Sequence, residues 1–327
     1  MPPAAQPRIL CFGANPALDI TYEVDAVDLG ESHRVETIYA RAGGKATNVA
    51  RVVDTLGGKA HLVAPLGGSA GDLFAEDVLD SGMSLRVVAI PGETRRSIAV
   101  VESSSRATLF NEAGPRWSTT VWPHLEEVLA AEIEAADAVA ISGSLPPDCP
   151  TDVIASIVSA CVEHDVPVLV DTAGPALLVA IEAGATMVKP NRPELRALTD
   201  AEGLEGCRAL RADHPDVIVV ASDGEAGLIA VGPDGAWRAR PKETVPGNPT
   251  GAGDALVAAL VLGLARHTPL EESLRLGIGT GAAAVQEPVA GRIDEDTAHE
   301  FAEAAIVEAL DEEAPNDSAA PNDSEGD

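Results

Sequence analysis

The sequence has little of several features that would place it in a special class of protein. Only 3% of its 327 residues are aromatic, and only four are cysteine. No apolar run reaches the length of a membrane span and no charged–apolar–small leader opens the chain. We therefore expect neither a membrane protein nor an exported one. The cysteines lack metal-site or redox spacing, which predicts reduced thiols in a cytoplasmic protein. They are Cys11, Cys149, Cys161 and Cys207.

Basic residues are also scarce. The chain has 22 Lys and Arg against 52 Asp and Glu, a formal net charge of −30. Such a charge argues against binding nucleic acid or docking on an anionic membrane. A solvated acidic surface or adaptation to salt both explain it. In either case a phosphate-bearing ligand would need cations gathered locally.

The residues that are present alternate between strand-like and helix-like segments. Hydrophobic residues make up 46% of the chain, so a core can be built from Ala, Val, Leu and Ile. Short buried strands are predicted at 8–14, 61–65, 138–142, 166–171, 185–189 and 217–221. Helices are predicted at 45–56, 123–135, 151–164, 193–199 and 254–266. This alternation predicts an α/β fold in which helices cover both faces of a mainly parallel sheet.

Two segments depart from that alternation. Residues 20–41 and 92–111 are rich in β-forming residues but have no helix after them, so we assign them to a small separate sheet. After residue 312 the chain becomes acidic and repeats APNDS. This composition predicts a disordered tail over 313–327 and one folded domain over 8–312.

Two glycine-rich turns precede helix-like runs. GNPTGAGDALVAALVLGLA (247–265) places glycines ahead of Asp254, and RAGGKATNVARVVDTLGG (41–58) places two glycines ahead of Lys45 and Asn48. Bare amides at the start of a helix can receive an anion, because the positive end of the helix dipole lies there. Ordinary helix starts after a glycine turn would explain each motif taken alone.

Five motifs occur together in a characteristic order. They are NPALD (15–19), AGGKATNVAR (42–51), SGSLPP (142–147), VKPNRPEL (188–195) and PTGAGDALVAAL (249–260). In order and spacing they resemble the ribokinase-like (PfkB) carbohydrate kinases, and most of all the 1-phosphofructokinase and tagatose-6-phosphate kinase branch. The resemblance covers about residues 8–310. It implies a three-layer α/β/α fold with a small β-sheet lid, ATP as phosphoryl donor and Mg²⁺ as metal.

The resemblance also implies a catalytic centre at the second glycine-rich turn. Gly251, Ala252 and Gly253 would form an anion hole for the transferred phosphoryl group, and Asp254 would be the base. A carboxylate that accepts the proton of a sugar hydroxyl typically accelerates such a reaction 10²–10⁴-fold. Preorganised amides stabilise the charge on the transferring oxygens. A plain helix cap is the alternative explanation of Asp254.

The nucleotide side is implied by two further motifs. In VKPNRPEL, Lys189 would reach the phosphates, while Asn191 and Glu194 would position Mg²⁺ through water. A helix start with Pro193 in its first turn is the alternative. The nucleotide phosphates would contact Ser222, Gly224 and Gly227, which a hairpin turn also explains. The adenine would lie between 245–250 and 277–286.

The substrate side is implied by residues from four of these regions. Asp19, Gly43, Gly44, Lys45 and Asn48 would hold the sugar hydroxyls and supply a cation. Arg95 and Ser144 would bind a phosphate already on the sugar, since Arg suits bidentate phosphate contacts. Arg34 and Arg96 could add to this site or simply be solvated. Ala46 and Ser97 depart from the family pattern and weaken the choice of sugar.

Three functions therefore remain open from the sequence. The first is an ATP-dependent kinase that converts fructose 1-phosphate to fructose 1,6-bisphosphate, with tagatose 6-phosphate and fructose 6-phosphate as other substrates. The second is a kinase for an unphosphorylated sugar or nucleoside, and the third a non-catalytic sugar-phosphate sensor. The lids, with Ile98, Val100 and Leu109 proposed on one apolar face, predict a homodimer, since a small isolated sheet is marginal in water.

Overall fold

The computed structural model describes residues 6–104, 106–117 and 121–310, and the predicted acidic tail at 313–327 lies outside them. The main sheet has ten strands in the order β14-β13-β12-β11-β10-β9-β8-β1-β4-β5. Strands from β11 to β5 along this order run parallel, and the β12–β14 edge is antiparallel. The strands are β1 (Arg8–Phe12), β4 (Lys59–Leu66), β5 (Ser84–Ala89), β8 (Ala138–Ser142), β9 (Val168–Asp171), β10 (Met187–Val188), β11 (Ile218–Ser222), β12 (Leu228–Gly232), β13 (Gly235–Arg240) and β14 (Ile306–Ala309).

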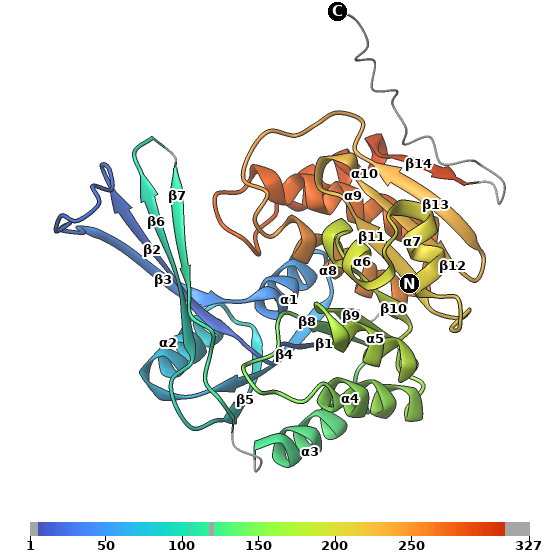
Figure 1. Ribbon diagram of the computed structural model, residues 1–327, viewed down its shortest axis with the longest axis horizontal. Helices are drawn as coiled ribbons and strands as arrows, with labels where there is room; N and C mark the ends of the chain where they lie inside the picture. The colour runs from blue at the N-terminus through green and yellow to red at the C-terminus, as the bar shows by residue number, and fades with distance from the viewer. Residues whose placement is uncertain (1–5, 105, 118–120, 311–327) are drawn as a thin grey trace, which may run out of the picture.

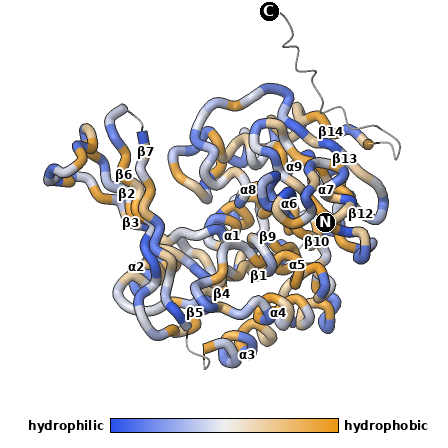
Figure 2. The backbone as a smooth tube through the Cα atoms, in the orientation of Figure 1, coloured by the Kyte–Doolittle hydropathy of each residue, from blue (hydrophilic) through white to orange (hydrophobic). Residues whose placement is uncertain are grey.

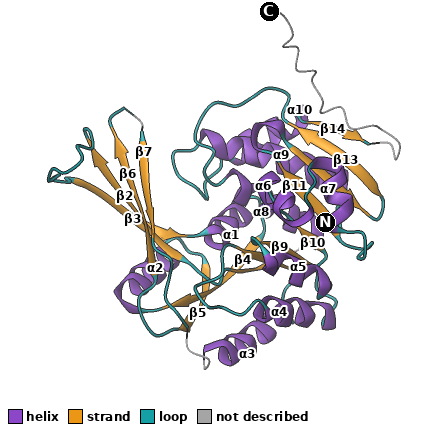
Figure 3. Cartoon of the chain, in the orientation of Figure 1, coloured by secondary structure: helices purple, strands orange, loops and turns teal. Residues whose placement is uncertain are grey.

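Helices cover both faces of this sheet, giving three layers (Figures 1 and 3). One face carries α1 (Lys45–Thr55), α2 (Gly68–Asp80), α8 (Ala252–Ala265), α9 (Leu270–Gln286) and α10 (Glu295–Ala304). The other carries α3 (Val121–Ile133), α4 (Asp152–Glu163), α5 (Pro175–Glu182), α6 (Arg192–Thr199) and α7 (Gly203–Leu210). The predicted three-layer α/β/α class is confirmed.

Two apolar cores lie on either side of the sheet. Alternate residues of the central strands point into them, so that Ile9 and Cys11 join one core while Leu10 and Phe12 join the other. Strands buried on both faces read as continuous apolar runs, which is why they were recognisable in the sequence. Figure 2 shows these strands as mostly hydrophobic. Within the described residues no helix is both long and apolar enough to cross a membrane.

The second sheet projects from the main body as a lid (Figure 1). Its strands, in the order β3-β2-β6-β7, are β2 (Ala17–Val24), β3 (Thr37–Gly43), β6 (Arg95–Glu102) and β7 (Ala107–Asn111). They fall at the two segments, 20–41 and 92–111, that broke the alternation in the sequence. The structure thus confirms a small separate sheet beside the main one.

The two faces of the lid differ in composition. Ile20, Ile98 and Phe110 lie opposite one another in register, with Val100 two residues along the same face. Leu109 pairs with Ala99 and therefore lies on the other face, so its assignment to one face with Ile98 and Val100 was wrong. The reason is the two-residue period of a strand, which sends neighbouring side chains to opposite faces. Ile38 and Phe110 remain 57% and 59% exposed.

Candidate active site

The five motifs converge at the carboxyl ends of the parallel strands. Asn15 follows β1, Ser144 follows β8, and Asp171 ends β9. Lys189 and Ser222 stand at the ends of β10 and β11. Ligands of open parallel sheets bind at this edge, because the loops that leave the strands gather there.

The second glycine-rich turn forms the start of α8. Gly251 caps the helix with φ of +90°, in the left-handed region that favours glycine. The first amides of a helix have no partner within it. The Ala252 N–H donates to the Pro249 carbonyl at 3.2 Å, so the amides of Gly251 and Gly253 remain as the stronger candidates for an anion hole.

Asp254 is buried in the first turn of α8, only 7% exposed. Its Oδ2 accepts a hydrogen bond from Asn48 Nδ2 at 2.8 Å, which joins the two glycine-rich motifs. Burial raises the pKa of Asp254 to about 6, against the opposing effects of this hydrogen bond and of Lys45 and Lys189. The carboxylate contacts Asn48 and does not cap its own helix through a side-chain hydrogen bond.

A buried carboxylate that the motifs did not reveal organises the two lysines. Asp171, which is 1% exposed, lies 3.2 Å from Lys45 Nζ and 3.2 Å from Lys189 Nζ. Although burial opposes it, Asp171, Asp254 and Glu194 together raise the pKa of Lys45. The only signal in the sequence was an aspartate that ends the apolar strand VLVD.

One cavity, of about 270 Å³, brings the proposed phosphosugar residues together. Arg95 Nε donates to the Asn15 carbonyl at 3.1 Å, and Arg95 Nη1 donates to the Glu112 carbonyl at 3.3 Å. These bonds use two of the five guanidinium donors, and Arg95 lines the cavity. Asn15 Nδ2 in turn donates to Ser144 Oγ at 3.4 Å. The lining includes Gly43, Gly44, Lys45, Arg95 and Ser144.

Asp19 lies beside this cavity at the base of the lid. A Cβ on Gly43 would be 2.0 Å from Asp19 Oδ2, so the carboxylate packs directly on that glycine. Burial raises the pKa of Asp19 to about 6, although Arg95, Arg41 and Arg51 oppose the shift. A side chain at position 43 would therefore displace the Asp19 carboxylate.

A second cavity, of about 500 Å³, lies on the other side of the α8 turn. Its walls include Ser222, Gly224 and Gly227 together with residues of 244–249 and of 277–285. Those last two segments are the ones between which the sequence placed an adenine. Gly253 lines this cavity, and a Cβ there would be 4.0 Å from Lys189 Nζ.

Asn191 and Glu194 form a capping box at the start of α6. Asn191 Oδ1 accepts from the Glu194 N–H at 2.9 Å, and Glu194 Oε2 accepts from the Asn191 N–H at 2.8 Å. Glu194 also lines the first cavity, and its Oε1 takes no part in the box. The described residues include no group of three or more acidic, His or Cys side chains that could hold a metal ion directly. Asn191 and Glu194 offer amide and carboxylate oxygens, the donor type that Mg²⁺ prefers.

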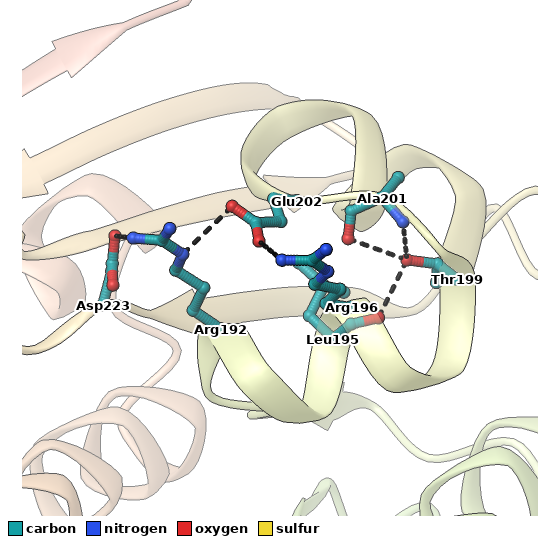
Figure 4. A network of polar contacts seen from close by, with 7 residues as sticks. All are labelled: Arg192, Leu195, Arg196, Thr199, Ala201, Glu202 and Asp223. Atoms are coloured by element: carbon teal, nitrogen blue, oxygen red, sulfur yellow. Dashed lines mark hydrogen bonds and ion pairs between the residues drawn. The ribbon is translucent and has the colours of Figure 1, made fainter. Parts of the chain in front are cut away.

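Ion pairs fix α6 relative to the loop after β11 (Figure 4). Arg192 Nη1 lies 3.4 Å from Asp223 Oδ2, while Arg192 Nε lies 3.0 Å from Glu202 Oε2. Arg196 also reaches Glu202, at 3.2 Å. The Asn191–Glu194 motif and the Ser222 turn are thus held side by side.

Of the two departures from the family pattern and the two further arginines, only Ala46 lines the Arg95 cavity. Arg96 lies 3.6 Å from Glu93, and Arg34 is exposed in the lid; neither lines the Arg95 cavity. Ser97 Oγ donates to Asn111 Oδ1 within the lid. Ala46 does line the cavity and packs under Gly13.

The chain is similar in sequence to known carbohydrate kinases. Residues 8–297 match the family described as pfkB family carbohydrate kinase. The ATP-dependent 6-phosphofructokinase isozyme 2 of Mycobacterium tuberculosis is 35% identical over 310 residues, covering 92% of this chain and 90% of the relative.

Two structures of Escherichia coli phosphofructokinase-2 are similar in fold. The complex with fructose-6-phosphate has a TM-score of 0.80 at 26% identity, covering 91% of this chain and 98% of that one. The tetrameric inhibited form has a TM-score of 0.82 at 27% identity, covering 91% and 99%. The chain belongs to the pfkB family of carbohydrate kinases.

Proposed function

We propose that this sugar kinase transfers the γ-phosphoryl group of ATP to a fructose monophosphate, giving fructose 1,6-bisphosphate and ADP. The observation that carries the proposal is the position of Asp254. It adjoins Gly253, which lines one cavity, and hydrogen-bonds Asn48, whose neighbour Thr47 lines the other. A carboxylate at this junction is placed to act on a hydroxyl that meets a phosphoryl group.

Asp254 is the proposed general base. A pKa of about 6 leaves it mostly ionised at neutral pH yet more basic than an ordinary carboxylate. A base works best when its pKa lies near the working pH. The amides of Gly251 and Gly253, at the positive end of α8, would stabilise the oxygens of the transferring group.

Arg95, Ser144 and Lys45 are the proposed residues for the phosphate already on the sugar. All three line a single cavity. Arg95 has further N–H donors beyond the two that bind backbone carbonyls. In a chain of net charge −30, Arg95 and Lys45 supply the local positive charge that a phosphosugar requires. Asp19, beside them, would accept hydrogen bonds from sugar hydroxyls.

The nucleotide is proposed to bind in the second cavity. Ser222, Gly224 and Gly227 would contact its phosphates, and Lys189 would reach them from beside Gly253, which lines this cavity. When bound, Mg²⁺ would neutralise charge on the ATP phosphates. Glu194 Oε1 and the Asn191 side chain would hold its water shell, as suits a metal that keeps several waters.

The motif resemblance and the sequence relative favour different phosphosugars as substrate. The motif resemblance favours fructose 1-phosphate, whereas the M. tuberculosis relative bears the name of a 6-phosphofructokinase. We rank fructose 6-phosphate first, because that relative matches over nine-tenths of its length. Fructose 1-phosphate is the second candidate, and both give the same bisphosphate.

The test is ADP release with fructose 6-phosphate, fructose 1-phosphate, tagatose 6-phosphate and free fructose in parallel. We expect turnover with a fructose monophosphate and little with free fructose. Asp254→Asn serves as the inactive control. Turnover on free sugars alone would contradict the phosphosugar site, and binding of phosphosugar without ADP release would indicate a sensor.

We further propose that the chain is a cytoplasmic homodimer joined through its lids. Ile20, Ile98, Val100 and Phe110 share the lid face opposite the one that carries Asp19, and Phe110 is more than half exposed. A second copy covering this face would remove the apolar surface from water. All four cysteines are free thiols, which supports a reducing compartment.

A further inference from the structure

Arg41 connects the lid to a distant loop of the main domain. It lies in β3 directly opposite Asp19 of β2. Its Nη1 donates to the carbonyl of Ala290 at 3.2 Å. Ala290 belongs to the segment 287–291, which leads from α9 toward α10.

The segment 287–291 is wedged between two parts of the catalytic centre. A Cβ on Gly251 would lie 2.9 Å from the Ala290 Cα, so Ala290 packs directly on the start of α8. Gly291, which has φ of +74°, packs against Asn48: a Cβ on Gly291 would lie 2.8 Å from Asn48 Oδ1. Close-packed contacts of this kind transmit a displacement because they contain no slack.

The beginning of the segment is tied to the loop before the α8 turn. Asn248 Nδ2 donates to the Pro288 carbonyl at 3.3 Å, and Asn248 Oδ1 accepts from the Thr250 N–H at 3.1 Å. Asn48, at the far side, donates to Asp254. The segment thus contacts the proposed anion-hole turn at Gly251, the base's hydrogen-bond partner Asn48, and the lid strand that carries Arg41.

We infer that Arg41 is a positioning residue that couples the sugar site to the phosphoryl-transfer site. A sugar that engages Asp19 fixes the lid strands, Arg41 carries that constraint to Ala290, and Ala290 holds Gly251 and Asn48 in place. This inference rests on the proposed function. It requires that the phosphosugar and ATP tighten each other's binding, since coupling between two sites is reciprocal.

Calorimetry on the full chain at pH 8 tests this coupling. The probe is the non-hydrolysable analogue AMP-PNP with Mg²⁺, titrated with and without saturating fructose 6-phosphate or fructose 1-phosphate. We expect the phosphosugar to tighten AMP-PNP binding in the wild type by a factor on the order of 5–150. In Arg41→Gln the factor should fall to below about 2 while each ligand alone keeps its affinity.

Arg292→Gln is the matched control. Arg292 lines the same surface groove as Arg41, but its described contacts include no bond to Ala290. It should keep the wild-type coupling factor. If Arg41→Gln does not fold, Arg41→Lys retains the charge and shortens the reach, and should give an intermediate factor.

Failure of the Arg41 coupling can be distinguished from failure of the proposed kinase function. Unchanged coupling in the Arg41 variants, or no coupling in the wild type, would overturn this inference while ADP release still supported the kinase. No ADP release with any fructose phosphate would instead overturn the proposed function.

Discussion

The pH dependence of catalysis should show two carboxyl groups titrating together. Burial raises the pKa of both Asp19 and Asp254 to about 6, and each acts in its ionised form in the proposed mechanism. As the pH falls through 6, both groups gain a proton and activity is lost. At pH 5 each would be ionised in about one molecule in eleven, so kcat/KM for the phosphosugar should fall about a hundredfold from its plateau.

The assay is kcat/KM for the phosphosugar at saturating MgATP between pH 5 and pH 8. In Asp19→Asn only Asp254 remains to titrate, so the decline at pH 5 should be about tenfold. The phosphate of the substrate also titrates, with a second pKa of about 6. Its effect is the same for both proteins and cancels when their profiles are divided.

The result that would refute this reasoning is an Asp19→Asn profile as steep as that of the wild type. It would mean that Asp19 does not titrate in the free enzyme near pH 6, and that its burial beside Gly43 is offset by the surrounding arginines. A wild-type acid limb near pH 4 would likewise contradict the burial of both groups.

Three other substitutions test the site and the assembly. Asp254→Asn should lower turnover 10²–10⁴-fold with ATP binding retained by calorimetry, and more than about a tenth of wild-type turnover would exclude it as the base. Arg95→Ala should raise KM for the phosphosugar by about ten- to a hundredfold, since a charge-assisted contact contributes roughly 1.5–3 kcal/mol. Equal weakening of ATP, or the same effect in Arg96→Ala, would point to a structural role. In sedimentation at micromolar protein, in moderate and in high salt, the wild type should be a dimer and Phe110→Asp a monomer, with Leu109→Asp on the opposite face as control. A monomeric wild type under both conditions would contradict the lid–lid contact.

Most of the main sheet could be predicted because its strands are buried on both faces. β8 begins and ends where the sequence placed it, and β1, β4 and β11 differ by a few residues. The segment at 185–189 shortened to Met187–Val188, and Pro190, which lacks an amide, limits its carboxyl end. The β13–β14 edge was not predicted, because half-exposed strands there lack a continuous apolar run.

The site was predictable only where residues lie in a contiguous motif. The Asn48–Asp254 hydrogen bond joins residues 206 apart, and the Arg41–Ala290 bond residues 249 apart. No local pattern encodes such pairs. Asp171 was missed for a related reason: its importance comes from the two lysines that the fold brings to it.

The scarcity of aromatic residues gives the protein a convenient optical property. Of its three tryptophans, Trp117 and Trp122 lie with ring centroids 3.9 Å apart. They follow Gly114, on which a Cβ would lie 2.2 Å from Asn15 Oδ1, next to the Arg95 cavity. Trp237, in β13, stands on the far antiparallel edge. Intrinsic emission therefore comes from few emitters, and two of them follow the loop that contacts Asn15, so a ligand that moves this loop should change the emission without an attached dye.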